Sequence, residues 1–256
     1  MEKLFIKNRK GMNMAVVVDE AEKQKGLVFL MHGFIGFKEH PLLTETAKIF
    51  KEKNYTTVSF DATHAFGESD GKMEDGTMTG YFNDLEDAIA WSKIQKWYDR
   101  HFFMVGHSLG GYCVSLHTTK DRNVRGLILF SPLVSGKLFL ETDDIKSIME
   151  EWEIRGIREW ISGSSQGAVK RSGYVFVGDS LRHDLLEVAE KIKCPVLMVT
   201  GDADDIIPMK DQKMLFDKIR GKKEMHIVKG GDHNLIEEEM PEDLQIALKD
   251  WINRHK

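Results

Sequence analysis

One serine stands in a setting that favours nucleophilic chemistry. Residues 102–105 are apolar and run into the pentapeptide 106–110, Gly-His-Ser-Leu-Gly. This G-x-S-x-G pattern is typical of a tight strand-to-helix turn that lifts the serine hydroxyl above a sheet. Glycine at its two outer positions removes a Cβ that would clash where strand and helix lie close together. Ser108 can then attack an acyl carbon, provided that a base, a carboxylate and two hydrogen-bond donors stand beside it.

His233 is the candidate base. Among ten histidines it is the one that follows the final predicted strand, 225–228, in a glycine-rich loop before the last helix. A neutral imidazole there can accept the serine proton on one nitrogen and donate to a carboxylate from the other. His226 lies within that strand and is expected to be structural. His107, in the variable position of the serine motif, is expected to serve packing.

Three aspartates compete for the role of the carboxylate. The predicted strand 195–200 is followed by Gly-Asp-Ala-Asp-Asp at 201–205. Asp204 is the preferred candidate acid, because it lies mid-loop between the glycine that ends the strand and the proline that begins the next helix. Asp202 could instead cap the turn, and Asp205 could face solvent.

Two backbone amides are candidates for stabilising the oxyanion. One is the N–H of Leu109, the residue after the serine. The other is the N–H of Phe34, in the His-Gly-Phe segment 32–34 that follows the apolar run 27–31. Losing one such donor typically costs about 10²–10³ in turnover. An ordinary turn is the alternative interpretation of segment 32–34, and the serine motif and the two matching loops make it less plausible.

The elements that must position these residues alternate along the chain. Buried strands are predicted at 27–31, 55–60, 102–105, 126–130, 195–200 and 225–228, and amphipathic helices near residues 41–50, 79–98, 109–119, 208 onward and 241 onward. The first two apolar runs, 3–7 and 12–18, flank a turn and predict a hairpin. This order predicts an α/β fold: a mostly parallel central sheet with an antiparallel edge and helices on both faces.

Residues 134–192 interrupt the alternation. The segment contains a helical pattern through Ile154, Ile157 and Ile161, a polar linker at 162–167, an extended apolar stretch at 174–177 and a helical pattern at 185–192. It is too long for a simple connection. We therefore expect a core formed by residues 1–133 and 193–256 and an inserted cap or lid formed by 134–192, with a flanking structural excursion as the alternative.

Composition excludes several classes of protein. The chain of 256 residues is 41% hydrophobic and 30% charged, which is typical of a globular protein with a sizeable core. A net charge of −5 and the lack of a long basic run argue against a nucleic-acid partner. Cys113 and Cys194 form neither a disulfide framework nor a metal motif and are expected to be small buried residues. No phosphate-binding, dinucleotide or metal-ligand motif is present, so no cofactor or metal is expected.

The location of the protein is expected to be cytoplasmic. No apolar stretch approaches the ~20 residues that span a bilayer, and the N-terminal residues 1–7 lack the apolar region of a signal peptide. The expected partner is a small-molecule ester substrate, and the sequence leaves a homo-oligomer open.

The chain as a whole resembles an α/β-hydrolase-fold serine esterase, and more narrowly the bacterial cinnamoyl (feruloyl) esterases and their short-chain carboxylesterase relatives. The similar stretches are 32–34, 60–61, 67–72, 106–111, 201–204 and 230–233. The resemblance implies the α/β-hydrolase fold, with Ser108 as nucleophile, Asp204 as acid and His233 as base. It also implies the amides of Phe34 and Leu109 as oxyanion donors. Residues 62–66 depart from the Arg/Gly-containing loop usual in that group.

The expected activity is hydrolysis of carboxylic esters through an acyl-enzyme on Ser108. The apolar and aromatic side chains of the insert favour short to medium acyl or aryl esters, hydroxycinnamoyl esters among them. A peptidase or amidase and a monoacylglycerol lipase are alternatives, because the same three residues serve those reactions. A ligand-binding member of the fold without catalysis is an alternative from another class.

Overall fold

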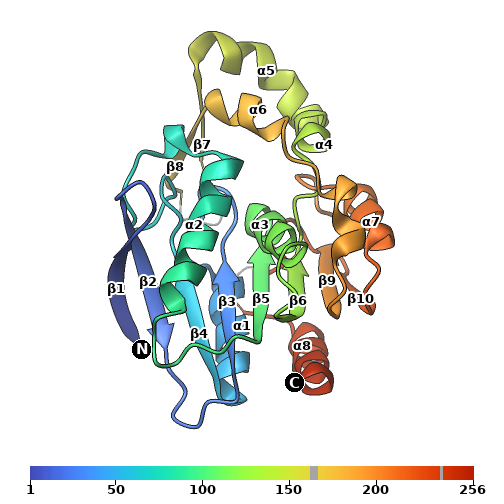
Figure 1. Ribbon diagram of the computed structural model, residues 1–256. Coiled ribbons are helices and arrows are strands. Elements are labelled where there is room, and N and C mark those ends of the chain that lie inside the picture. Colours follow the sequence, from blue (N-terminus) through green and yellow to red (C-terminus); the bar gives the residue numbers. More distant parts are fainter. Residues whose placement is uncertain (162–166, 237–238) are drawn as a thin grey trace.

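The central sheet has eight strands in the computed structural model, which describes residues 1–161, 167–236 and 239–256 (Figure 1). Their order is β1-β2-β4-β3-β5-β6-β9-β10. The bounds are β1 Glu2–Lys7, β2 Asn13–Asp19, β3 Gly26–Met31, β4 Tyr55–Phe60, β5 Phe102–His107, β6 Val124–Phe130, β9 Val196–Gly201 and β10 Lys223–Val228. The pairs β1–β2 and β2–β4 are antiparallel, and all other pairs are parallel. The predicted parallel sheet with an antiparallel edge is confirmed.

Helices cover both faces of the sheet, because alternate residues of each inner strand point to opposite sides. Val28 and Leu30 pack on one face under α1 (Pro41–Glu52) and α8 (Glu242–His255). Phe29 packs on the other face, which is covered by α2 (Met78–Ser92), α3 (Leu109–Thr118) and α7 (Met209–Lys218). Strands β3 and β5 are buried along their whole length. The ends of these two strands therefore hold the following loops on a rigid base.

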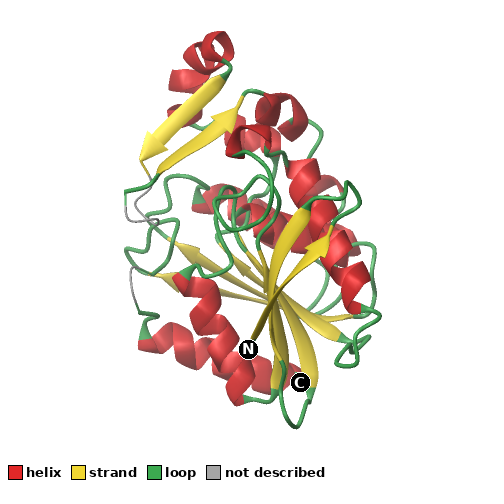
Figure 2. Cartoon of the chain, turned by 90° about the vertical axis from the view of Figure 1, so that its left-hand side faces the viewer, coloured by secondary structure: helices red, strands yellow, loops and turns green. Residues whose placement is uncertain are grey.

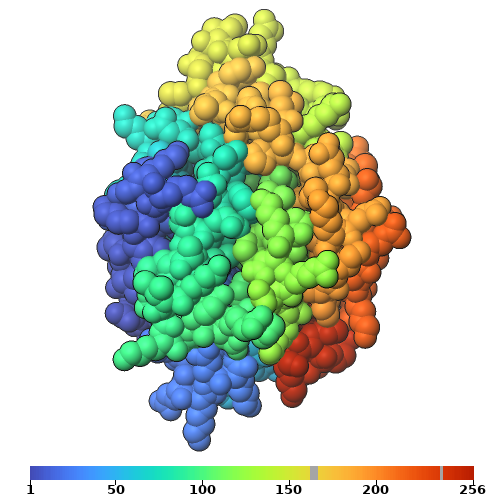
Figure 3. All heavy atoms as spheres, in the orientation of Figure 1, coloured from blue at the N-terminus to red at the C-terminus, as the bar shows by residue number. Residues whose placement is uncertain are grey.

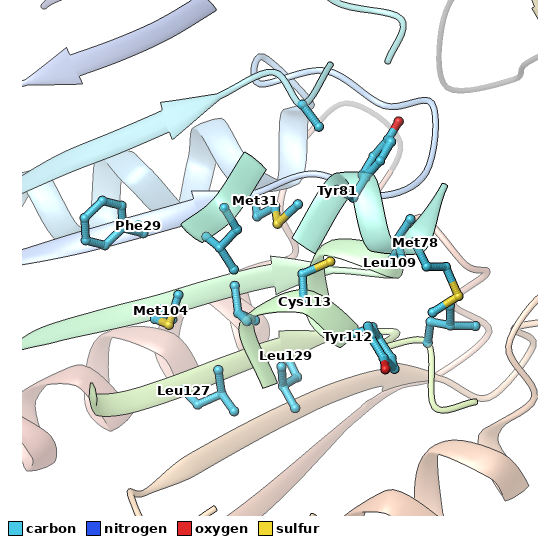
Figure 4. Packing of buried hydrophobic residues seen from close by; sticks show 14 of the residues in the cluster. Phe29, Met31, Met78, Tyr81, Met104, Leu109, Tyr112, Cys113, Leu127 and Leu129 are labelled. Atoms are coloured by element: carbon cyan, nitrogen blue, oxygen red, sulfur yellow. The ribbon is translucent and has the colours of Figure 1, made fainter. Parts of the chain in front are cut away.

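The larger core cluster lies between the sheet and helices α2 and α3 (Figure 4). Met104 and Leu127 reach it from neighbouring strands, and Tyr81 and Tyr112 reach it from the two helices. Cys113 is fully buried in this cluster, whereas Cys194 is only half-buried. No helix in the described ranges is long and apolar enough to cross a membrane.

Residues 134–192 form one helix of 13 residues, α5, and several shorter elements. These are α4 (Gly136–Leu140), α5 (Asp143–Arg155), β7 (Ile157–Ile161), β8 (Val169–Gly173), α6 (Val175–Ser180) and the 3₁₀ turns η3 (Leu185–Glu187) and η4 (Ala189–Lys191). Figures 1 and 2 show α4, α5, α6 and the β7–β8 hairpin beyond the end of the sheet toward which β3 and β5 point. Figure 3 shows atoms of α4, α5 and α6, in yellow-green to light orange, at the top of the molecule directly above those of the core.

Three predictions within this insert are wrong. The helix predicted through Ile161 ends at Arg155, because Gly156 adopts a φ of 72°. Residues 157–161 then form a strand paired antiparallel with 169–173. The stretch 174–177, predicted to be extended, enters the short helix α6, because Phe176 and Val177 are buried on one side of it. The predicted helix at 185–192 is two 3₁₀ turns, and most of the linker 162–167 lies outside the described residues.

Candidate active site

Ser108 occupies the single position between the end of β5 and the start of α3. Its backbone has a φ of 53°, in the left-handed region that non-glycine residues rarely adopt. Such a conformation costs on the order of 1–3 kcal/mol and persists only where the surroundings hold it. Here the Ser108 N–H donates to the Phe130 carbonyl at 2.9 Å, and the Ser108 carbonyl accepts from the Tyr112 N–H at 3.1 Å. The turn is therefore fixed from β6 on one side and from α3 on the other.

The two glycines of the serine motif are required by close backbone approaches, as the spacing predicts. A Cβ on Gly106 would overlap the backbone of Gly110 and Gly111 in the first turn of α3. A Cβ on Gly110 would overlap the carbonyl oxygens of Met31 and His32 at the end of β3. The helix therefore packs directly on the strand ends, and Ser108 lies beside the loop that follows β3.

Asp204 and His233 meet across two neighbouring loops. The loops after β9 and β10 pack so closely that a Cβ on Gly201 would overlap the Gly231 carbonyl. His233 Nδ1 lies 3.0 Å from Asp204 Oδ2, and both residues are buried. Because a carboxylate only accepts hydrogen bonds, Nδ1 carries the proton, and Nε2 of the neutral ring is left as an acceptor.

The Asp204 carboxylate is itself held by three donors. The N–H groups of Ile206 and Ile207 donate to Oδ1 at 3.1 and 2.8 Å, and Gln212 Nε2 donates to Oδ2 at 3.1 Å. Asp202 is exposed and accepts from the Gly230 N–H at 2.6 Å, which ties the two loops together. Asp205 is also exposed. Of the three competing aspartates, Asp204 is the one that contacts His233.

The loop after β3, which contains Phe34, lies beside the serine. A Cβ on Gly33 would lie 3.0 Å from Ser108 Cβ. Neither the Phe34 N–H nor the Leu109 N–H donates to an acceptor among the described residues. The following residue, Ile35, has a φ of 49°, and its N–H donates to the Tyr81 hydroxyl at 2.9 Å.

His32 orients the same loop. Its Nε2 accepts from the Ala62 N–H at 3.0 Å, so its Nδ1 carries the proton and donates to the Gly33 carbonyl at 2.7 Å. Complete burial lowers the pKa of His32, which keeps the ring neutral. The peptide group after Gly33 is thereby fixed with its carbonyl toward His32, and this sets the direction of the Phe34 N–H.

Two further histidines lie behind His233. His107 Nε2 donates to the His233 carbonyl at 2.9 Å, and burial lowers the pKa of His107 well below its usual value. The His40 ring stacks on His107 at 5.2 Å between centroids. Burial and the nearby charge of Lys170 lower the pKa of His40 to about 4. The expected packing role of His107 thus includes holding the backbone of His233. His40 has no sequence signal, because its partners come from distant parts of the chain.

A buried ion cluster anchors the loops around the site. Asp61 is fully buried and accepts from the Lys38 N–H at 2.7 Å, from Lys38 Nζ at 2.9 Å and from the Glu68 N–H at 2.8 Å. Lys38 Nζ also donates to Glu68 Oε2 at 2.7 Å. Although burial opposes it, these hydrogen bonds raise the pKa of Lys38 above its usual value. The stretches 60–61 and 67–72 are therefore structural, because Asp61 and Glu68 tie their loop to Lys38 in the loop after β3.

Replacing Asp61 by alanine should lower the free energy of unfolding by about 3–5 kcal/mol, because it leaves the Lys38 ammonium buried with a weakened set of partners. Urea unfolding followed by circular dichroism measures the change. Asp217→Ala removes a carboxylate from an exposed ion pair with Lys213 and should cost less than about 1 kcal/mol. Equal losses in the two variants would contradict the buried-cluster interpretation.

Ser108, Leu109, Phe34 and His233 line one cavity of about 370 Å³. The insert supplies much of its wall through Ile145, Trp152, Arg158, Trp160, Lys170, Ser172 and Phe176. Trp152 is buried, and its Nε1 donates to the Ser172 carbonyl at 2.9 Å, which ties α5 to β8. No group of three or more His, Cys, Asp or Glu side chains in the described part of the chain is arranged to hold a metal ion.

The sheet, its order and the covering helices together define a protein of the α/β-hydrolase fold. The chain matches the Hydrolase_4 family model, described as serine aminopeptidase, S33, over residues 22–166 and 180–240. These ranges make up most of its length, and the chain belongs to this hydrolase family.

Several known proteins are similar to the chain. An uncharacterized 31.7 kDa protein of the traX-finO intergenic region of Escherichia coli is 25% identical, and the match covers 96% of each chain. Human mitochondrial palmitoyl-protein thioesterase ABHD10 is 23% identical over 91% of this chain and 74% of that protein. The structure of Est1E from Butyrivibrio proteoclasticus with ferulic acid bound superimposes with a TM-score of 0.81, at 20% identity and 98% coverage of both chains. The structure of mouse alpha/beta hydrolase domain-containing protein 10 superimposes with a TM-score of 0.79, at 19% identity and 100% coverage of both chains.

Proposed function

We propose that the protein is a serine hydrolase of carboxylic esters in which Ser108 is the nucleophile, His233 the base and Asp204 the acid that orients it. The main support is that Ser108 and His233 line the same cavity while His233 Nδ1 lies 3.0 Å from Asp204. The strained φ of 53° at Ser108 adds support, since such strain is concentrated at functional sites.

The proposed reaction has two steps. Ser108 Oγ forms a bond to the carbonyl carbon of the ester while His233 Nε2 takes its proton. The carbon–oxygen bond of the leaving alcohol then breaks, and His233 returns the proton to the alcohol oxygen. Water repeats the sequence on the acyl-enzyme, releasing the carboxylic acid and restoring Ser108.

The developing negative charge needs donors that are already in place. Phe34 and Leu109 line the cavity, and their N–H groups have no acceptor among the described residues, which supports them as the donors to an oxyanion. Because both donors belong to the backbone, replacing the Phe34 side chain is expected to change the shape of the cavity more than the oxyanion hole.

We propose that residues 134–192 act as a cap that selects the substrate. The aromatic and aliphatic walls that the insert gives the cavity suit short to medium acyl or aryl groups. A hydroxycinnamoyl ester is one candidate, because the similar Est1E structure has ferulic acid bound.

The related hydrolytic reactions differ in the leaving group, which is an alcohol, a thiol or an amine. The family description names a serine aminopeptidase, and a similar human protein is named a palmitoyl-protein thioesterase. A panel of 4-nitrophenyl butyrate, methyl ferulate, a medium-chain monoacylglycerol, a short acyl thioester and an aminoacyl anilide, ranked by kcat/KM, compares these classes. We expect the oxygen esters to rank first, and a higher rank for the anilide would contradict the proposed esterase.

Covalent labelling tests the nucleophile directly. Diethyl 4-nitrophenyl phosphate should phosphorylate Ser108 Oγ with release of 4-nitrophenolate. Mass spectrometry should then find one diethylphosphoryl group, on the peptide that contains residue 108. A label on another residue, with Ser108 unmodified, would contradict the assignment.

A further inference from the structure

The inserted hairpin turns two cations toward the cavity. Strands β7 and β8 pair antiparallel, with Arg158 opposite Ser172 and Trp160 opposite Lys170, and all four residues line the cavity. The residues between them face the other way. Arg171, for example, is exposed and forms an ion pair with Glu159 across the two strands.

Lys170 differs from its neighbour in burial and in partners. It is 6% exposed, and its ammonium forms no hydrogen bond or ion pair with any described residue. It lies 5.9 Å from the centre of the Phe66 ring. The nearby Ser172 is also buried, and its hydroxyl has no partner within the same described ranges. A buried ammonium without a counter-ion is costly, which lowers the pKa of Lys170 to about 8.

The other charges near the cavity do not neutralise Lys170. Asp144 and Asp205 line the cavity but are exposed, so solvent and salt screen them. Arg158 carries a second positive charge, 5.1 Å from the Trp160 ring. The charge of Lys170 acts on two histidine rings, those of His32 and His40. Burial lowers the pKa of both rings and keeps them neutral. Glu74, on the turn that packs against β8, lies near Arg171 on the other face of the strand.

We propose that Lys170 binds a carboxylate carried by the substrate at a point remote from the ester group, so that the preferred substrates are singly anionic esters such as the half-esters of dicarboxylic acids. The proposal rests on the proposed hydrolase function and specifies its substrate class. The buried ammonium of Lys170 matches a single negative charge, because Arg158, the other cation among the described residues of the wall, is only half-buried and lies over the Trp160 ring. The apolar residues of the same cavity, including Trp160 and Phe176, match a chain or ring that joins the carboxylate to the ester.

Matched pairs of esters test the preference. One pair is 4-nitrophenyl hydrogen adipate and its neutral methyl ester, with the charge on the acyl side. The other is 4-carboxyphenyl hexanoate and 4-carbamoylphenyl hexanoate, with the charge on the alcohol side. In at least one pair the wild-type kcat/KM should be about 10- to 100-fold higher for the anionic ester, the range expected of one charge-assisted hydrogen bond.

Variants identify the residue responsible. Lys170→Met should reduce the anionic-to-neutral ratio of kcat/KM to near one, because it keeps the length of the side chain and removes the charge. Arg171→Met removes the same charge one residue further along β8, on the outer face, and should leave the ratio as in the wild type. Equal ratios for Lys170→Met and wild type would overturn the proposal.

The pH dependence separates charge from packing. The wild-type preference should be full below pH 7 and should fall as the pH rises through about 8, because the Lys170 ammonium is then lost. In Lys170→Arg the guanidinium stays charged, so the preference should persist to pH 10. A preference that does not change with pH in the wild type would contradict a role for Lys170.

Binding gives a result that is independent of hydrolysis. An excess of adipate at pH 6.5 should raise the Tm of the wild type and of Arg171→Met but not that of Lys170→Met. If all four esters resist hydrolysis while adipate still stabilises the wild type, the proposed hydrolase function is wrong and the anion site stands. If neutral esters are hydrolysed without any preference for charge, the hydrolase function stands and the anion site is wrong.

Discussion

Replacing Ser108 by alanine should lower kcat for 4-nitrophenyl butyrate by about 10⁵- to 10⁶-fold, because no other group in the proposed mechanism can carry the acyl intermediate. Steady-state release of 4-nitrophenolate measures the loss. Binding should persist, because the cavity walls and the two proposed oxyanion donors are unchanged, and the product acid, butyrate, should still raise the Tm of the variant.

Ser115 supplies the matched control. It lies on α3, the helix that begins directly after the proposed nucleophile, it is buried, and its hydroxyl has no partner among the described residues. Because it does not line the cavity, Ser115→Ala should keep kcat within about twofold of the wild type. Near-wild-type activity in Ser108→Ala would overturn the proposed nucleophile, whichever value the control gives.

The parts of the site that the sequence predicts are those set by local geometry. Gly106 and Gly110 lie where two backbone segments are in contact, so their spacing predicts the turn that holds Ser108. The loops that hold Asp204 and His233 follow the last two strands of a parallel sheet, and such loops meet at one edge. Short-range patterns are therefore enough to predict Ser108, Asp204 and His233 as candidates, and the structure brings Asp204 and His233 into contact.

The supporting contacts are long-range and leave no pattern in the sequence. Tyr81 holds Ile35 from 46 residues away, and His107 holds the backbone of His233 from 126 residues away. The helix predicted in the insert is wrong for a different reason. Isoleucines at 154, 157 and 161 suit a helix by spacing, but Gly156 in the left-handed region ends the helix between them. Lys170 could not be recognised as a cavity residue from the sequence, because it faces the cavity only through the pairing of β7 with β8.

Replacing Asp204 by asparagine should lower kcat/KM for 4-nitrophenyl butyrate by about 10⁴-fold through a change of tautomer at His233. The side-chain oxygen should stay on the N–H groups of Ile206 and Ile207, which puts the amide nitrogen in the place of Oδ2, 3.0 Å from His233 Nδ1. That nitrogen only donates, which favours a ring whose Nδ1 accepts over one whose Nδ1 shares the oxygen at 3.1 Å with the two N–H groups. In the favoured tautomer the proton lies on Nε2, which can then no longer take the serine proton.

The competing aspartate gives the control for this prediction. Asp202→Asn keeps an oxygen that accepts from the Gly230 N–H, so the two loops remain joined and kcat/KM should change by less than about threefold. Measuring kcat/KM of the two variants at one pH compares an aspartate that contacts the imidazole with one that only joins the two loops. A larger loss in Asp202→Asn than in Asp204→Asn would contradict Asp204 as the acid, because the carboxylate that contacts His233 should have the larger effect on the tautomer of the ring.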